Sequence, residues 1–328
     1  MAEANPKPFY VGVDLGGTKI LAGIFQPGLK LIATSKSSTK ADRGPKAVID
    51  RVVRTIRDAV DEADLDIKAI AGVGIGAPGS VQSAEGKILF SPNLPGWSDI
   101  PLKRELEKAL GLPVEVDNDC NVCTLGVHAA ELGGKPRHLV GIFLGTGIGA
   151  GIILNGRLHS GFNCTAGEIG HMVLEVGGPK CGCGNRGCFE ALASRSAITR
   201  RILAAIKDGQ KTILTDMLGG DLSDLRSGDL RKALKKGDKL VEKVIEDAAE
   251  YTGIAVGNII NLIGPQVVVL GGGIIDALED EMMAIIVETA QDYAMTGTAK
   301  GVEIVASKLG DHAGITGAAV LARDRPKP

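Results

Sequence analysis

The chain repeats one local plan at two places about 130 residues apart: an apolar strand, a glycine turn and a second apolar strand. The first copy runs from Phe9 to Phe25, and the second runs from Leu139 to Leu154. Short apolar runs separated by glycine are typical of β-hairpins. Two such hairpins, each opening its own half of the chain, predict a duplicated architecture of two similar α/β domains.

The segments that follow each hairpin alternate between helix and strand patterns. Buried strands are expected over residues 70–75, 114–116 and 267–270, and helices over residues 45–64, 101–110, 119–132, 194–207 and 238–263, with a further helix after Gly271-Gly272-Gly273. This alternation predicts parallel-rich sheets covered by helices. The polar stretch from Asp208 to Gly237 is expected to be irregular.

A glycine-rich segment carries three cysteines, Cys181, Cys183 and Cys188, with His171 ten residues upstream of the first. Three thiolates and one imidazole form the ligand set of a tetrahedral structural zinc site, which leaves no position open for water or substrate. Cysteines separated by one residue would form a strained disulfide, and a third would stay unpaired. We therefore expect zinc, with a disulfide, apolar packing and an iron–sulfur centre as alternatives.

Charge and hydropathy limit the partners of the chain. It has 37 Lys and Arg against 39 Asp and Glu, so no basic field attracts nucleic acid. The N-terminus carries no signal segment, and no apolar stretch of about 18 residues is free of glycine and charge. We expect no nucleic-acid partner, no membrane partner and a cytoplasmic location. A reducing cytoplasm favours metal over a disulfide.

Two glycine runs formally match the dinucleotide-binding fingerprint, at residues 72–77 and 145–150. That fold requires a helix directly after the glycines. Residues 151–154 instead have a strand pattern, and Pro78 interrupts the other run. We therefore reject a dinucleotide site at both places.

The glycine hairpins suit phosphate instead, because turns without side chains let backbone N–H groups converge on phosphate oxygens. Thr18, Lys19 and Thr146 would add donors or charge, and Asp14, at the end of a buried strand, would hold Mg²⁺ through water. The alternative is that the glycines serve only tight turns. Two hairpins and a third glycine run, Gly271 to Gly273, favour a nucleotide that contacts two domains.

Several motifs occur in a family-specific order: Asp14-Leu-Gly-Gly-Thr-Lys19, Ser91-Pro-Asn-Leu-Pro-Gly-Trp97, Asn118-Asp119, Leu144-Gly-Thr-Gly-Ile-Gly-Ala-Gly151, Gly167-Glu-Ile-Gly-His171 and Cys181-x-Cys-Gly-x-x-Gly-Cys188-x-Glu190. In these motifs the chain resembles the ROK family (repressors, open reading frames and kinases) of the sugar-kinase and actin-like superfamily. The resemblance runs from about residue 10 to residue 323. Cys120 and Cys123 depart from the usual alanines, and Val127-His128 from a common Gly-Glu pair.

The resemblance implies an α/β fold of the actin-like, hexokinase type. Its duplicated domains would contain ribonuclease H-like sheets, with a cleft between them. The smaller domain is expected to comprise residues 1–125 plus 311–328, and the larger one residues 126–310. A homodimer is expected from the family.

The resemblance also implies an ATP-dependent hexose kinase with Mg²⁺ and structural Zn²⁺, and glucose as the leading substrate. Asp119 would be the general base that accepts the proton of the sugar hydroxyl. From the residues alone, Asp119 could equally be the cap of the helix that follows it, a role that Asp117 or Asn118 could also fill.

The remaining site residues follow from the same resemblance. The sugar would contact Gly79, Asn93, Asn118, Asp119, Glu168, His171 and Glu190. The nucleotide would contact Asp14, Gly16, Gly17, Thr18, Lys19, Gly145, Thr146, Gly147, Gly271, Gly272 and Gly273. Zinc would bind His171, Cys181, Cys183 and Cys188, and so would hold Glu168, His171 and Glu190 as one wall of the sugar site.

Other functions stay open at this point. The substrate could be N-acetylglucosamine, N-acetylmannosamine, mannose or fructose, and polyphosphate could replace ATP. A sugar-responsive regulator of the same family would carry an N-terminal DNA-binding domain of about 80 residues, for which we expect no room before Asp14. An actin-like filament protein would leave Asn93 and the zinc segment unexplained.

Overall fold

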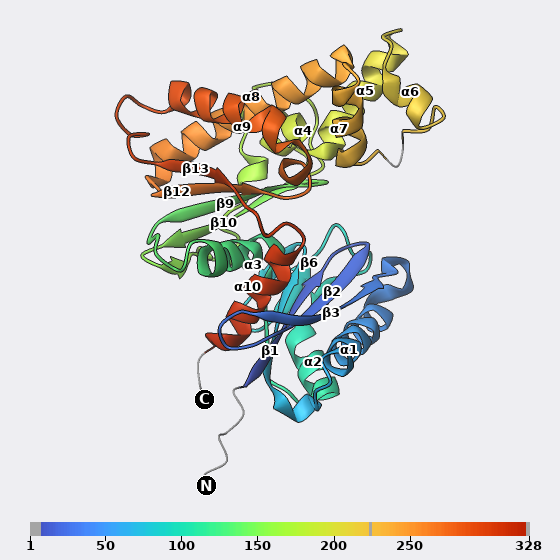
Figure 1. Ribbon diagram of the computed structural model, residues 1–328, viewed down its shortest axis with the longest axis vertical. Coiled ribbons are helices and arrows are strands. Elements are labelled where there is room, and N and C mark those ends of the chain that lie inside the picture. Colours follow the sequence, from blue (N-terminus) through green and yellow to red (C-terminus); the bar gives the residue numbers. More distant parts are fainter. Residues whose placement is uncertain (1–7, 223–224, 326–328) are drawn as a thin grey trace. The chain divides into compact units, whose positions relative to one another are not determined.

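The computed structural model describes residues 8–222 and 225–325, which fold into two compact units (Figure 1). The first unit contains the chain up to residue 137, residues 151–167 and the chain from residue 311. The second contains residues 138–150 and 168–310. Residues 126–137 and 151–167 thus group with the first unit, whereas the sequence analysis assigned them to the second. The expected domain limits stay a prediction.

The first unit is built on a five-stranded sheet with strand order β3-β2-β1-β4-β8. Its strands are β1 (Phe9–Leu15), β2 (Lys19–Phe25), β3 (Leu31–Ser38), β4 (Ile70–Ala77) and β8 (Val114–Asn118), with a small separate sheet of β5 (Ser80–Gln82), β6 (Lys87–Phe90) and β7 (Ser98–Ile100). Its helices are α1 (Gly44–Glu62), α2 (Leu102–Leu110), α3 (Asp119–Gly126) and α10 (His312–Arg323), with 3₁₀ turns at Ala41–Arg43 and Ile67–Ala69 and a π-helical turn at Val127–Glu131.

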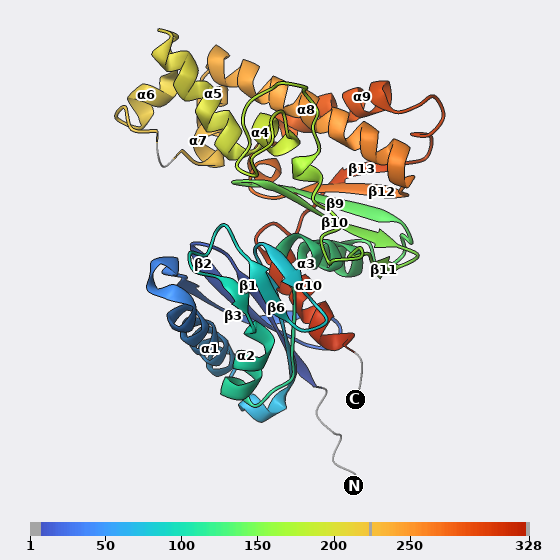
Figure 2. The ribbon, with the colours of Figure 1, turned by 180° about the vertical axis from the view of Figure 1, so that it is seen from behind.

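Helices cover both faces of this sheet, α1 and α2 on one side and α3 and α10 on the other (Figures 1 and 2). Successive side chains of a strand point to opposite faces. Val11 and Val13 of β1 are therefore buried in the main core with α1 and α2. Gly12 lies between them and faces α10, where a Cβ would collide with the carbonyl of Ile315. Glycine at this position lets helix and sheet approach closely.

The second sheet has strand order β11-β10-β9-β12-β13. Its strands are β9 (Leu139–Leu144), β10 (Ile148–Leu154), β11 (Arg157–Leu158), β12 (Val267–Gly271) and β13 (Glu303–Ala306); β11 and the end of β10 group with the first unit. The helices of the second unit are α4 (Phe189–Ala193), α5 (Arg195–Lys207), α6 (Ile213–Met217), α7 (Ser227–Lys235), α8 (Lys239–Ile263) and α9 (Ile275–Tyr293), with a 3₁₀ turn at Ile169–His171. α8 and α9 lie side by side over one face of the sheet (Figure 1).

The two sheets share one plan, which confirms the expected duplication. In each, a glycine hairpin (β1–β2 or β9–β10) supplies two neighbouring strands, and two further strands follow in parallel on the same side. The predicted strands and most predicted helices occur within a few residues of their expected limits. The expected helix over residues 119–132 is α3 followed by the π-helical turn.

The expectation of an irregular segment from Asp208 to Gly237 was wrong. This stretch contains α6 and α7. The side chain of Asp238 holds the start of α6, where it accepts hydrogen bonds from the Ile213 N–H at 2.7 Å and the Thr212 hydroxyl at 2.6 Å. These contacts at α6 join residues distant in sequence, which a local pattern does not reveal, whereas α7 begins with a local hydrogen bond from the Arg226 N–H to the Asp229 carboxylate. Among the helices that the structure describes, none combines the length and the apolar character needed to cross a membrane.

Candidate active site

Strands of the first sheet bring acidic residues to one edge. Asp14 on β1 pairs in register with Gly76 on β4, and Gly76 pairs with Asp117 on β8. α3 begins directly after β8, and a Cβ on Gly76 would lie 3.4 Å from the Cα of Asp119. Parallel strands that end together therefore bring Asp14 and Asp119 to the same edge of the sheet.

Asn118, rather than Asp119, caps α3. Its side-chain oxygen accepts hydrogen bonds from the backbone N–H groups of Cys120 at 2.9 Å and Asn121 at 3.2 Å. Asp117 is buried and accepts a hydrogen bond from the Asn121 amide at 2.9 Å, so it stiffens the same turn. The capping role that the sequence left open for Asp119 is thus filled by its neighbour.

The carboxyl groups at this edge have raised pKa values. Burial raises the pKa of Asp119, although hydrogen bonds from the N–H and the thiol of Cys120 oppose the change. The pKa of Asp14 is raised to about 6, first by burial and then by the charge of Asp119, while Lys19 acts in the opposite direction. Two partly buried carboxyls with little compensating positive charge form an environment that a cation would stabilise.

Hydrogen bonds from Thr39 hold the first glycine turn. The turn closes through the Gly16 N–H, which donates to the carbonyl of Lys19 at 2.9 Å. The Thr39 hydroxyl donates to the carbonyl of Gly16 at 2.7 Å, and the Thr39 N–H donates to the carbonyl of Thr18 at 2.9 Å. Thr39, which directly follows β3, therefore fixes the turn and leaves the side chain of Thr18 exposed.

The ammonium group of Lys19 pairs with Asp311 at 2.7 Å, just before α10. This ion pair lowers the pKa of Asp311. Two residues into α10, Gly314 packs against Asp14, since a Cβ there would lie 3.1 Å from its carboxyl carbon. The start of α10 thus borders both charged residues of the motif Asp14 to Lys19.

Gly79, Asn93 and Asn118 lie around the same turn. The Asn118 amide donates to the carbonyl of Gly79 at 3.1 Å. Gly79 has φ of 100°, and any Cβ there would collide with the carbonyl of Phe90, so glycine is required. The backbone of Asn93 borders Gly17, where a Cβ would lie 2.9 Å from the Asn93 carbonyl oxygen.

The second glycine turn has a similar construction in the second unit. The Gly145 N–H donates to the carbonyl of Gly147 at 2.9 Å. The backbone N–H of Ile148, the residue after the turn, donates to the Glu190 carboxylate at 3.0 Å. A Cβ on Gly147 would collide with this carboxylate. Glu190 therefore contacts the turn directly, in addition to its expected place beside the zinc ligands.

The third glycine run packs against the strand that leads into this turn. Gly272 has φ of 86°, and a Cβ there would lie 2.6 Å from the carbonyl oxygen of Leu144. The Ile274 N–H donates to the same carbonyl at 3.1 Å. The Gly271 to Gly273 run therefore lies beside the second glycine turn, as a shared nucleotide site would require.

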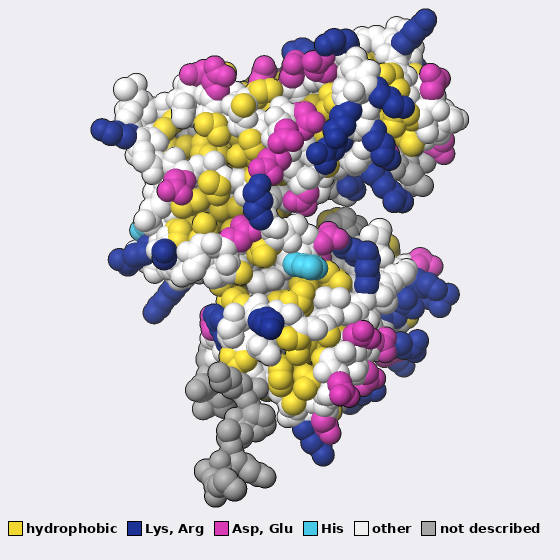
Figure 3. Space-filling model, viewed as in Figure 1, with side chains coloured by type: hydrophobic (Ala, Val, Ile, Leu, Met, Phe, Trp, Pro, Cys, Tyr) yellow, Lys and Arg dark blue, Asp and Glu magenta, His cyan; other side chains and the backbone are white. Residues whose placement is uncertain are grey.

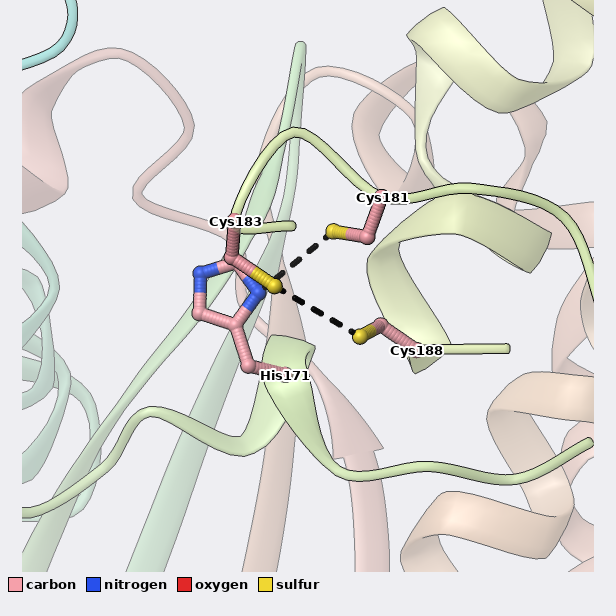
Figure 4. A group of neighbouring side chains, drawn as sticks. All are labelled: His171, Cys181, Cys183 and Cys188. Atoms are coloured by element: carbon pink, nitrogen blue, oxygen red, sulfur yellow. Dashed lines mark hydrogen bonds between the residues drawn. The ribbon is translucent and has the colours of Figure 1, made fainter. Parts of the chain in front are cut away.

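The four expected zinc ligands converge in the second unit (Figure 4). Their donor atoms all lie within 4.8 Å of one another. Cys181 Sγ lies 3.7 Å from His171 Nδ1, and Cys183 Sγ lies 3.7 Å from Cys188 Sγ. Four ligands at zinc–sulfur distances of about 2.3 Å would have edges of about 3.8 Å in a tetrahedron. The donor set and its spacing therefore fit a tetrahedral metal ion.

Two glutamates adjoin this cluster. Glu168 Oε2 lies 3.9 Å from Nε2 of His171, on the ring nitrogen that does not face the sulfurs. Glu190 Oε1 lies 3.8 Å from Cys181 Sγ. Both glutamates therefore lie next to the expected metal ligands, and their role as one wall of a sugar site stays a prediction.

The predicted site residues gather in two groups, one in each unit. The first group contains Asp14, Gly16, Gly17, Thr18, Lys19, Gly79, Asn93, Asn118 and Asp119, and the second contains the other predicted residues. Asp311 and Arg195, which contact Lys19 and Thr146, were not predicted. Both contacts join segments far apart in sequence. Asp311 lies in a segment, residues 309–318, that resembles a terminal helix of the family, but no site role was expected for it, and Arg195 belongs to no motif that carried the resemblance.

Comparisons with known proteins cover nearly the full length of the chain. A family model described as the ROK family matches residues 10–325. A glucokinase of Thermotoga maritima is 35% identical over 98% of this chain and 99% of its own length. The crystal structure of a ROK family glucokinase from Streptomyces griseus in complex with glucose and AMPPNP is 30% identical, with a TM-score of 0.83 over 97% of this chain and 100% of that chain. A ROK hexokinase structure from Thermus thermophilus is 32% identical, with a TM-score of 0.77 over 96% of this chain and 97% of its own.

Proposed function

This chain belongs to the ROK family, and from that premise we propose that it is an ATP-dependent glucokinase, which transfers the γ-phosphoryl group of ATP to the 6-hydroxyl of glucose. The full-length likeness to two glucokinases supports the activity. The observation that carries the mechanism is the position of Asp119. Asn118 caps α3, so the Asp119 carboxylate is not needed as the helix cap, and it lies beside Asp14 and the first glycine turn.

Phosphoryl transfer depends mainly on positioning and on neutralising charge, with a base for the proton of the attacking hydroxyl. Asp119 accepts that proton from the 6-hydroxyl. Burial raises its pKa toward the working pH, which suits a group that must take up a proton. Asp14 would hold Mg²⁺ through water, and Mg²⁺ supplies positive charge to the phosphate oxygens.

The remaining predicted residues divide by chemistry. Amides and carboxylates that pair with sugar hydroxyls are assigned to glucose: Asn93, Asn118, Glu168 and Glu190, with His171 and the backbone at Gly79. Donors and glycine turns are assigned to ATP: Gly16, Gly17, Thr18, Lys19, Gly145, Thr146, Gly147 and Gly271 to Gly273. The close approaches at Gly17, Gly147 and Gly272 support turns without side chains at these places.

We also assign Zn²⁺ to His171, Cys181, Cys183 and Cys188, on the fit of their donor atoms to a tetrahedron. Four protein ligands leave no open position, so the ion is structural. All six cysteines are free of disulfides, which supports the proposed cytoplasmic location. A homodimer is proposed from the family alone.

Replacing Asp119 with alanine tests the mechanism. We expect turnover of glucose and ATP to fall at least about 100-fold, because a positioned base contributes about that factor or more. Glucose binding should persist, and fluorescence of Trp97 can report it, because this sole tryptophan is buried in the Asn93 loop.

Asp61→Ala, on the exposed side of α1, is the matched control. Undiminished turnover in a coupled assay would contradict the assignment of the base, and a wild-type protein that phosphorylates no hexose would contradict the function itself.

A further inference from the structure

The start of α5 holds the second glycine turn through four hydrogen bonds, one of which runs from the Ser196 N–H to the carbonyl of Thr146 at 3.4 Å. The Arg195 N–H donates to the carbonyl of Gly145 at 3.0 Å. The Ser196 hydroxyl donates to the carbonyl of Thr146 at 2.8 Å. The Arg195 guanidinium donates to the hydroxyl oxygen of Thr146. Backbone and side chain of Arg195 therefore both lie at the turn, 49 residues from Thr146 in sequence.

The charge of Arg195 is uncompensated. Within the described part of the chain, no carboxylate lies within ion-pair distance of its guanidinium, and Thr146 is its side-chain partner. Lys19 at the first glycine turn, by contrast, pairs with Asp311 at 2.7 Å. A guanidinium carries several N–H donors in a planar fork, so one bond to Thr146 leaves others for an anion.

The surroundings of Arg195 are basic. α5 carries Arg195, Arg200, Arg201 and Lys207 and has no acidic residue, although Arg201 pairs with Asp247 of α8. On the face shown in Figure 3, Lys and Arg side chains gather over the end of the second unit that contains α5 and α7. A positive field of this kind raises the local concentration of a polyanion.

The Thr146 hydroxyl completes the arrangement. Its oxygen accepts the hydrogen bond from Arg195, so its own proton is free to donate elsewhere. Thr146 is exposed at the tip of the turn, whereas the Gly145 N–H donates to the Gly147 carbonyl and the Ile148 N–H donates to Glu190. The guanidinium and the hydroxyl together present donors of the kind that bind phosphate.

We propose that Arg195 binds the phosphate chain of the nucleotide and uses Thr146 to orient its guanidinium toward it. The inference rests on the proposed kinase function, and it adds a residue that none of the family motifs contains. Arginine suits the role because its fork can hold two phosphate oxygens at once, which the ammonium group of lysine does not do.

Binding of MgADP, inorganic tripolyphosphate and adenosine tests the proposal, measured by titration calorimetry without sugar. We expect Arg195→Ala to weaken MgADP and tripolyphosphate binding about 10- to 100-fold, the loss typical of a charged hydrogen-bonding group. Adenosine binding should stay within about twofold of the wild type, because adenosine has no phosphate. Arg195→Lys should recover part of the loss, because it keeps the charge. Lys207→Ala, at the other end of α5 and about 18 Å along the helix from Arg195, removes the same charge and should change the binding of each ligand by no more than about twofold, because salt screens a charge at that distance.

The Ser196→Ala variant distinguishes direct phosphate binding by Arg195 from a role of Arg195 in holding the turn. It removes a bond to the turn without removing charge. If Ser196→Ala weakened tripolyphosphate binding as much as Arg195→Ala, Arg195 would act by holding the turn, and the proposal would be wrong. Unchanged binding of MgADP and tripolyphosphate in Arg195→Ala would also overturn it. These titrations need no turnover, so their outcome is independent of whether the wild-type protein phosphorylates glucose.

Discussion

Asp14 shows how a single buried carboxyl group can lower the stability of the fold at neutral pH. Its carboxyl lies beside Asp119 and packs against Gly314, and its pKa is raised to about 6. The ordinary value for aspartate is about 4. The folded protein therefore binds this proton more tightly than the unfolded chain does. Protonation of Asp14 therefore stabilises the folded protein relative to the unfolded chain. This contribution is complete below about pH 4 and is lost as the pH rises through about 6.

Asp14→Asn should therefore stabilise the protein at neutral pH in the absence of nucleotide. Near pH 7.5 the free energy of unfolding should rise by about 1–3 kcal/mol, because the uncharged amide avoids the cost of the buried charge. Near pH 4 the variant and the wild type should differ little. Urea unfolding at the two pH values measures both quantities. A variant that is less stable at pH 7.5, or one with the same gain at both pH values, would contradict the assigned environment of Asp14.

At the scale of elements, the sequence was most informative where local geometry decides the structure. Both glycine hairpins were predicted, because apolar runs and glycine turns are local features. α6 and α7 were missed. For α6 the reason is that Asp238 holds its start across 25 residues. The contact of Glu190 with Ile148 was missed for the same reason, at 42 residues apart. Such contacts are set by packing, which a pattern of neighbours does not encode.

The zinc segment is the element whose role is easiest to test. Glu190 contacts both Cys181 and the Ile148 N–H, so loss of the metal should loosen the second glycine turn as well as the segment itself. We expect Cys183→Ser to lose stoichiometric zinc, as measured by mass spectrometry of the purified protein, and to melt at a lower temperature. Cys164→Ser should retain both, because Cys164 lies outside the ligand cluster. Full zinc content in Cys183→Ser would refute the assigned ligand set.

At the scale of the whole molecule, the order of motifs along the chain predicted the family and the duplicated fold, and both are confirmed. The preference for one hexose is a different kind of property. It depends on which hydroxyls and substituents find partners, and the polar residues Asn93, Asn118, Glu168 and Glu190 suit several sugars. Likeness along nearly the full length to the Thermotoga maritima glucokinase supports glucose.

The ratio kcat/KM across a panel of sugars, measured with ATP and Mg²⁺, tests this central claim most directly. The panel comprises glucose, mannose, fructose, N-acetylglucosamine and N-acetylmannosamine. We expect glucose to exceed each of the others by at least about tenfold, because buried polar groups left without a partner cost about 1–3 kcal/mol each. A different sugar that leads by a similar factor, or no ATP-dependent phosphorylation of any member, would contradict the assignment of this chain as a glucokinase.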